Sequence, residues 1–329
     1  MRILLIVLAL AISWVLGKFL WFTQMPLKSY AEPLPQLTSE ESELRDRLSS
    51  EVSYLSVNIG DRSLPRPDSL QAASDYLTNN LREQGYKVVE LPYSVGNEKV
   101  HNLEASLPGT DSKLGQVVVG AHYDSVAGTV AANDNGTGVA AVLEIARLVK
   151  QMKFRRTIRF VLFVNEEPPY FQTATMGSRV YAHQLRQDGV PVSAMISLET
   201  IGFYSDQLGS QKYPPILSLF YPSRGNFITF VGNTESRGLV RESIRSFRES
   251  TRFPSEGIAA PDNWLGIGWS DQWSFWQEGY PGIMVTDTAP FRYPYYHTPN
   301  DTVDKVNFDR TARVVEGIHM VVEQLANKP

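Results

Sequence analysis

Apolar and polar positions along the chain follow two periods, one typical of helices and one typical of buried strands. Apolar residues recur at helical spacing near both ends of the chain, and between them short β-branched runs alternate with helix-like stretches. Helices are expected at 38–56, 68–84, 138–150, 178–186, 237–249 and 309–326. Strands are expected at 116–120, 157–164, 194–198, 227–231 and 282–285.

Strands that alternate with helices predict an α/β fold with a doubly wound, mainly parallel central sheet flanked by helices on both faces. The first helix has a capping box at its start, because Thr38 is followed three residues later by Glu41. The segment 204–225 shows little periodicity and contains Pro214-Pro215. We expect it to be an insertion loop near a site.

The chain begins with an apolar run that we expect to lie outside the folded domain. Residues 3–22 are long enough to cross about 30 Å of hydrocarbon, with Lys18 and Trp21 near one end. The best signal-cleavage site, Val15-Leu16-Gly17, is poor, which favours a retained anchor over a cleaved signal. The body is therefore expected outside the cytoplasm, membrane-anchored or else secreted or periplasmic after cleavage.

Three regions are expected along the chain. Residues 1–25 are a signal anchor or signal peptide, residues 26–37 are a proline-containing linker, and residues 38–329 form a single domain. A length of 329 residues allows one large α/β core.

Charge and cysteine content narrow the chemistry. The chain has 31 Lys+Arg against 35 Asp+Glu and no long basic run. It therefore lacks the basic cluster that binds a nucleic-acid backbone, and nucleic acid is not expected as a partner. The absence of cysteine excludes disulfides, a thiol nucleophile and Cys-ligated metals. Any metal must therefore be bound by His, Asp or Glu.

Acidic and imidazole side chains follow the predicted strands. His122, Glu166-Glu167 and Glu199 each come directly after a strand, and Asp134 lies in a Gly-containing turn ahead of a helix. In open α/β sheets the ligand crevice lies beyond the carboxyl ends of the strands. Carboxylates crowded there repel one another unless a cation lies between them, and His297 offers a second imidazole. The pattern favours zinc or a neighbouring first-row ion, with room for two ions that share a carboxylate.

These motifs, taken in order, resemble the co-catalytic di-zinc aminopeptidase family, which also contains glutamate carboxypeptidase and the peptidase-like ectodomain of the transferrin receptor. The likeness spans about residues 70–325. It rests on five parts: His122-x-Asp124-Ser125, Ala-Asn-Asp134-Asn-Gly-Thr-Gly, Glu166-Glu167, Glu199 after the next strand, and Tyr296-His297-Thr-Pro.

The resemblance implies a zinc-peptidase fold and a role for each matching residue. One zinc would be held by His122, Asp134 and Glu199, and the other by Asp134, Glu167 and His297. Glu166 would be the general base toward a metal-bridging water. Asp124 would accept the second N–H of His122, and Tyr296 would donate a hydrogen bond to the oxyanion.

The chain departs from the family pattern at three places. Glu199 stands where Asp is more usual, Gln272 stands where His is expected after Ser-Asp, and the link 168–176 is longer than usual. The longer link is expected to reshape the substrate cleft.

The sequence thus predicts a zinc-dependent exopeptidase with a peptide substrate, an aminopeptidase in first place. Three alternatives stay open: a carboxypeptidase or dipeptidase, a glutaminyl cyclase-like acyltransferase, and an inactive peptidase-like binding ectodomain. The first would need arginines for substrate carboxylates, with Arg224, Arg252 and Arg292 as candidates. The remaining histidines are expected to be structural: His101, His183 and His319.

Overall fold

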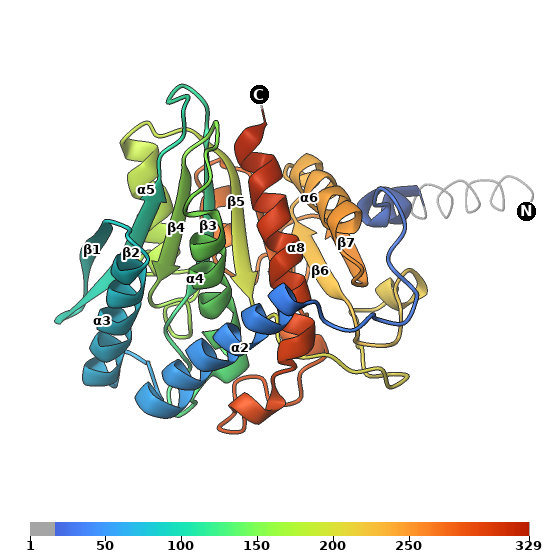
Figure 1. The fold of residues 1–329 in the computed structure, drawn as a ribbon, viewed down its shortest axis with the longest axis horizontal. Coiled ribbons are helices and arrows are strands. Elements are labelled where there is room, and N and C mark those ends of the chain that lie inside the picture. The colour runs from blue at the N-terminus through green and yellow to red at the C-terminus, as the bar shows by residue number, and fades with distance from the viewer. Residues whose placement is uncertain (1–16, 329) are drawn as a thin grey trace, which may run out of the picture.

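The computed structural model describes residues 17–328 and has one mixed sheet of eight strands at its centre (Figure 1). The strand order is β1-β2-β4-β3-β5-β8-β6-β7. Pairs β3/β4, β3/β5, β5/β8 and β6/β7 are parallel, whereas β1/β2, β2/β4 and β6/β8 are antiparallel. The strands are β1 (Val88–Val95), β2 (Glu98–Leu107), β3 (Gln116–His122), β4 (Ile158–Phe163), β5 (Val192–Glu199), β6 (Ile228–Gly232), β7 (Ser255–Ala259) and β8 (Gly282–Thr286).

Helices cover both faces of this sheet, as expected for a doubly wound fold. Helices α2, α4, α6 and α8 lie on the face toward the viewer in Figure 1, and α5 and α7 pack on the other face. The helices are α2 (Ser39–Ser53), the π-helical turn η1 (Tyr54–Ile59), α3 (Pro67–Glu83), α4 (Gly138–Val149), α5 (Gly177–Gln187), α6 (Arg237–Ser250), α7 (Gln272–Trp276) and α8 (Phe308–Asn327). Short 3₁₀ turns lie at Leu217–Leu219, Ala289–Phe291 and Val303–Lys305.

The alternation of side chains in β3 explains why both faces are covered. Val117 and Val119 join the cluster formed with α4 and α8, while Val118 points to the other cluster with Phe163 and Phe275. All five side chains are fully buried, so β3 has no solvent-exposed face. The strand ends that carry polar residues are thereby held in a rigid central position.

Most predicted elements are present within a few residues of their expected bounds, and the capping box of Thr38 and Glu41 is formed. The pattern missed the β1/β2 hairpin, β7 and α7. Strand β1 is an edge strand with mostly exposed or half-buried positions and a proline, Pro92, so it lacks a clear apolar run. Helix α7 has five residues, too few for a periodic signal.

The predicted membrane anchor falls mainly on residues 1–16, which lie outside the described residues. Residues 17–23 are helical. Among residues 17–328, the structure has no helix that is long and apolar enough to span a bilayer.

The segment predicted as a linker is held against the domain. The Arg248 guanidinium donates to the carbonyls of Pro26 and Leu27 at 3.0 Å each, and the Ser255 N–H donates to Ser29 Oγ at 2.9 Å. These contacts attach the chain before α2 to α6 and β7.

Gly317 in the middle of α8 permits the close approach of α6. A Cβ at this position would overlap the ring of Phe247 and the methyl group of Thr251. Alanine normally stabilises a helix by about 1 kcal/mol relative to glycine. At Gly317 the clash should dominate, because overpacking costs roughly 1–3 kcal/mol.

We therefore expect Gly317→Ala to lower the midpoint of thermal unfolding. Gly238 in α6 is the matched control, because a Cβ there meets nothing within 4 Å. Gly238→Ala should leave the midpoint unchanged or raise it. An unchanged or raised midpoint for Gly317→Ala would contradict this account of the α6/α8 contact.

Candidate metal centre

The carboxyl ends of three neighbouring strands bring the predicted polar residues to one edge of the sheet. His122 ends β3, Glu166 and Glu167 follow β4, and Glu199 ends β5. Asp134 comes from the turn η2 (Ala132–Thr137) that leads into α4. This is where a parallel sheet places ligand-binding residues.

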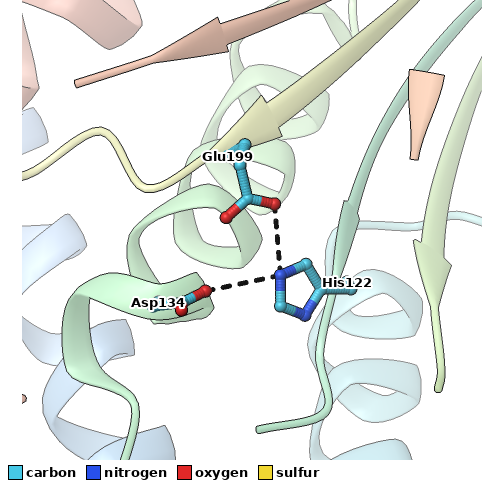
Figure 2. A group of neighbouring side chains, drawn as sticks. All are labelled: His122, Asp134 and Glu199. Carbon is cyan, nitrogen blue, oxygen red and sulfur yellow. Dashed lines mark ion pairs between the residues drawn. The ribbon is translucent and has the colours of Figure 1, made fainter. Parts of the chain in front are cut away.

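The first group of ligating atoms surrounds one imidazole nitrogen. His122 Nε2 lies 3.2 Å from Glu199 Oε2 and 3.5 Å from Asp134 Oδ1. Figure 2 shows the carboxylates of Glu199 and Asp134 turned toward the same nitrogen. All three side chains are buried.

A second group shares Asp134 with the first. His297, in the loop after β8, places Nε2 3.1 Å from Asp134 Oδ2 and 3.2 Å from Glu167 Oε2. The two oxygens of Asp134 thus face different imidazoles. Asp134 could therefore contribute one carboxylate oxygen to each group.

Several polar atoms of this centre lack a partner in the protein and could be satisfied by a metal ion. The ligand atoms of each group lie within 4.8 Å of one another. His122 Nε2, Asp134 Oδ2 and Glu167 Oε1 are buried without a hydrogen-bond partner, an arrangement that is costly unless a ligand satisfies them. A donor set of imidazole and carboxylate without thiolate suits zinc or a related first-row ion.

Burial and mutual repulsion disturb the acid–base properties of the site. Burial raises the pKa of Glu166 well above its ordinary value and that of Glu167 to about 8. Burial opposes the charge on His297, but the adjacent carboxylates of Asp134 and Glu167 outweigh it and raise the pKa of His297 to about 10. For Asp134 burial is again outweighed, and the two histidines hold its pKa below the ordinary range. Without a metal, protons must neutralise the cluster.

Asp124 supports the glutamate pair more directly than it supports His122. Its carboxylate accepts the backbone N–H groups of Glu166 and Glu167 at 3.1 Å each. His122 Nδ1 lies 3.6 Å from the Asp124 carboxylate and 3.3 Å from its carbonyl oxygen. The side chain thus fixes the turn after β4 and lies beside the imidazole that it was predicted to orient.

Asp301 holds the turn that carries Asp134, and the sequence reasoning did not identify it. Its carboxylate accepts the backbone N–H groups of Asn133 and Asp134 at 2.8 and 2.9 Å, and the Tyr293 hydroxyl at 2.6 Å. The available signal was its position four residues after His297 in the same polar turn.

Arg62 also supports the backbone around the candidate ligands, and no pattern in the sequence indicates this role. Its guanidinium is fully buried and donates only to backbone carbonyls, among them those of Tyr123, Val130 and Ala131 at 2.8–3.0 Å. Tyr123 follows His122, and Ala131 lies just before η2. Arg62 therefore holds both ends of the segment that joins His122 to Asp134.

The departures from the family pattern are accommodated locally. Glu199 Oε2 accepts a hydrogen bond from Ser270 Oγ at 2.7 Å, so the longer side chain is still fixed. Gln272 is buried, and its amide donates to the carbonyl of Ile267 at 3.0 Å. The glutamine thus supports the backbone of the loop before α7.

An apolar cavity of about 100 Å³ adjoins the centre, with Glu199 and Tyr296 in its wall. The ring of Tyr296 is stacked on that of His297, with centroids 3.8 Å apart. As predicted, the segment 204–225 lies beside the site, because Tyr213, Leu217 and Tyr221 line this cavity. Of the described residues, none from 168–176 lines it, but the Gln172 amide donates to the Gly268 carbonyl at 3.0 Å, between the lining residues Ile267 and Trp269.

The other histidines lie elsewhere. Among residues 17–328, His101, His183 and His319 belong to none of the metal-ligand groups. His183 contacts Glu278 at 3.2 Å, and His319 lies 2.8 Å from Glu323 on its own helix.

Sequence comparison shows that the chain is similar to known peptidases. The sequence profile of peptidase family M28 matches residues 102–322. The uncharacterized protein YfbL of Escherichia coli (strain K12) is 35% identical over 282 residues, which cover 83% of this chain and 86% of that protein. Leucine aminopeptidase 1 of Arthroderma otae is 27% identical over 240 residues, which cover 69% of this chain and 58% of that protein.

Solved structures share the fold at lower identity. BSAP, a zinc aminopeptidase from Bacillus subtilis, superposes with a TM-score of 0.70 at 14% identity and covers 90% of this chain and 97% of its own. The glutaminyl cyclase of Tannerella forsythia superposes with a TM-score of 0.62 at 20% identity, covering 87% and 98%. At these identities the likeness shows the fold alone.

The contacts of Arg62 predict an effect on metal affinity. Arg62→Lys keeps the charge but loses the fork that holds Tyr123, Val130 and Ala131, so the zinc affinity should fall by roughly 10–100-fold, as for other residues that position ligands. Arg66→Lys, at an exposed side chain in the same loop, is the matched control and should have no effect. Competition titration with a chelator measures both. Equal affinities for the two variants would contradict the proposed role.

The raised pKa values predict how stability depends on pH. Folding raises the pKa of Glu167 from 4.5 to about 8, so the stability of the metal-free protein falls as pH rises through that window. Folding raises the pKa of His297 from 6.5 to about 10, and the stability it contributes is likewise lost as pH rises toward 10. A bound metal would replace these protons.

Thermal unfolding of chelator-treated and zinc-loaded protein at about pH 6 and about pH 9 tests this linkage. The midpoint of the chelated protein should fall between the two pH values, and the stabilisation by zinc should be larger at the higher pH. Stabilisation by zinc that is equal or smaller at the higher pH would be the contrary result.

Proposed function

The chain belongs to peptidase family M28, and from this premise we propose that it is a zinc-dependent aminopeptidase that removes N-terminal residues from peptides. The observation that carries the proposal is the pair of ligand groups that share Asp134, each with one histidine and two carboxylates. These groups could hold two ions, and the leucine aminopeptidase relative supports the same reaction.

His122, Asp134 and Glu199 would hold one zinc ion, and Asp134, Glu167 and His297 the other. When bound, the metal would polarise the scissile carbonyl and bring the pKa of a water near neutrality. Glu166 lies beside the first group, with Oε2 3.8 Å from His122 Nε2. It is held by Asp124 through its backbone N–H, and its raised pKa suits a group that takes a proton and returns it.

In this proposal Glu166 accepts the proton of the attacking water and delivers it to the leaving amine. Tyr296 donates its hydroxyl proton as a hydrogen bond to the developing oxyanion. Its pKa is raised by burial and by the nearby carboxylates, so the phenol stays protonated.

In this proposal the cavity beside the centre binds the side chain of the N-terminal residue of the substrate. Apolar residues from β6, β7 and β8 line it: Val231, Ile258 and Met284. Glu199 stands at one wall, where negative charge favours the α-ammonium of a free N-terminus. An apolar residue such as leucine is the expected occupant.

The arrangement favours the aminopeptidase over a carboxypeptidase for acidic substrates. Among the described residues, the cavity lining includes none of the three arginines that such a reaction would use. Arg292 is buried and donates to Gln211 Oε1 at 2.7 Å and to the Phe227 carbonyl at 2.8 Å. A glutaminyl cyclase would need only part of the ligand set present here.

For the location, we propose that the apolar N-terminal run is retained as a membrane anchor and that the body lies outside the cytoplasm. The length and composition of residues 3–22 support this proposal. Sequencing the N-terminus of the protein recovered from a membrane fraction tests retention.

Glu166→Gln tests the reaction. The variant keeps the shape of the side chain but removes its basicity, so kcat on leucine anilide should fall by about 10²–10⁴-fold. Zinc content, measured by elemental analysis, should stay equal to that of the parent. Glu249→Gln, at an exposed position of α6, is the matched control and should keep full activity.

Other results would redirect the assignment. Full activity in Glu166→Gln would remove its role as base. Zinc without anilide hydrolysis would favour the carboxypeptidase, and cyclisation of an N-terminal glutamine peptide would favour the cyclase. Acetyl-leucine anilide, which lacks the free amine, should not react with an aminopeptidase.

A further inference from the structure

Large apolar side chains gather at the surface where the N-terminal helical segment 17–23 meets the body. Their exposed fractions lie between 43 and 78%. We call this set the apolar rim, and it consists of Leu20, Trp21, Ile216, Leu219 and Leu265. Exposed apolar side chains of this size, gathered in one place, mark an interaction surface.

Contacts beneath the rim bring its three chain segments together. The ring of Phe19 stacks on Phe220, with centroids 5.8 Å apart, and packs on Trp264 at 5.5 Å. Leu265 itself lines a groove of about 230 Å³ together with Phe19, and Ile216 lies between two residues that line the same groove, Pro215 and Leu217. Leu20 and Leu219 are next in sequence to the stacked rings.

The helical segment is fixed on the body. Phe22 is 8% exposed and belongs to the cluster that contains Leu217, Ile258 and Met284. Its ring lies 5.2 Å from that of Trp264. A segment with a buried aromatic anchor holds a defined direction relative to the body, unlike a free tether.

The composition of the sequence before this segment favours a lipid bilayer as the partner of the rim. Between Arg2 and Lys18 the chain has no charged residue, and a run this apolar partitions into hydrocarbon. It reaches the described part of the chain at Gly17, within one helical turn of Leu20.

Trp21 and its neighbours have the character of a membrane interface. The guanidinium of Arg237 lies over the Trp21 ring, 4.4 Å from its centroid, and donates to the Trp21 carbonyl at 3.0 Å. Arg241 donates to the carbonyl of Gln24 close by. Tryptophan with arginine is typical of the headgroup region, next to aliphatic side chains that enter the acyl chains.

We propose that the apolar rim lies in the lipid bilayer that holds the N-terminal run, so that the body is docked on the membrane. This inference rests on the proposed membrane anchoring and is independent of the proposed hydrolysis. The groove under the rim and the substrate cavity share Leu217, Leu265 and Ile267 as lining residues. The docked orientation therefore places the cavity beside the membrane surface.

The absence of cysteine allows a direct test on the full chain. Leu219→Cys and Leu265→Cys are each labelled with an environment-sensitive fluorophore, and the protein is reconstituted into vesicles of phosphatidylethanolamine and phosphatidylglycerol. Val57→Cys is the matched control: it is 73% exposed and lies in η1, which packs on α3 near the β1/β2 edge of the sheet, whereas segment 17–23 packs near β7 at the other edge (Figure 1).

Lipids that carry a quencher in their acyl chains should remove most of the fluorescence at positions 219 and 265 and leave that at 57 unchanged. Equal quenching at all three positions, or none in protein that floats with the vesicles, would overturn the docked orientation. So would protein that fails to float, and in that case the proposed anchor fails with it while anilide hydrolysis is unaffected. Probes at 219 and 265 that are shielded from water but not quenched would indicate contact with a second copy instead.

A charge variant gives a second readout. Ile216→Asp/Leu219→Asp should keep the protein on the vesicles through its N-terminal run, but quenching at position 265 should be lost. Val57→Asp is the control and should leave that quenching unchanged. Retained quenching at 265 in the double variant would overturn the role of the rim.

Discussion

Repulsion among buried carboxylates is the constraint on which the rest of the site depends. Asp134, Glu166, Glu167 and Glu199 lie together at the end of the sheet with little access to water. Such a group is tolerated only if cations or protons offset its charge. The strand ends, the turn η2 and the loop after β8 hold two imidazoles and these acids close enough together to share a bound cation.

The supporting residues keep the cluster in place by satisfying its backbone. Asp124 and Asp301 each accept two backbone N–H groups in the turns that present the ligands. Arg62 instead satisfies carbonyl groups, because it donates to one just after His122 and to one shortly before Asp134. Because these hydrogen bonds fix the loops, they also fix the positions of the side chains that the loops carry.

How much could be predicted from sequence depends on how local the signal is. The clustering of His122, Glu167 and Glu199 could be predicted because each lies at or just after the end of an apolar strand, and a strand end can be predicted from the hydrophobic pattern. The role of Arg62 could not be predicted, because its partners beside the site, Tyr123 and Val130, lie more than sixty residues away and a single arginine in a loop has no periodic context. The β1/β2 hairpin was missed for a related reason, since an exposed edge strand needs no apolar run. The contacts of residues 26–29 with α6 and β7 likewise have no local signal.

The shared carboxylate of Asp134 has a thermodynamic consequence. Because its two oxygens face different histidines, an ion bound in one group would alter the charge and position of Asp134 in the other. If both groups bind an ion, the two binding equilibria are linked and the linkage is reciprocal: each ion changes the affinity of the other by the same factor. Metal loading would then be cooperative, with a sign set by whether ordering of Asp134 outweighs repulsion between the ions.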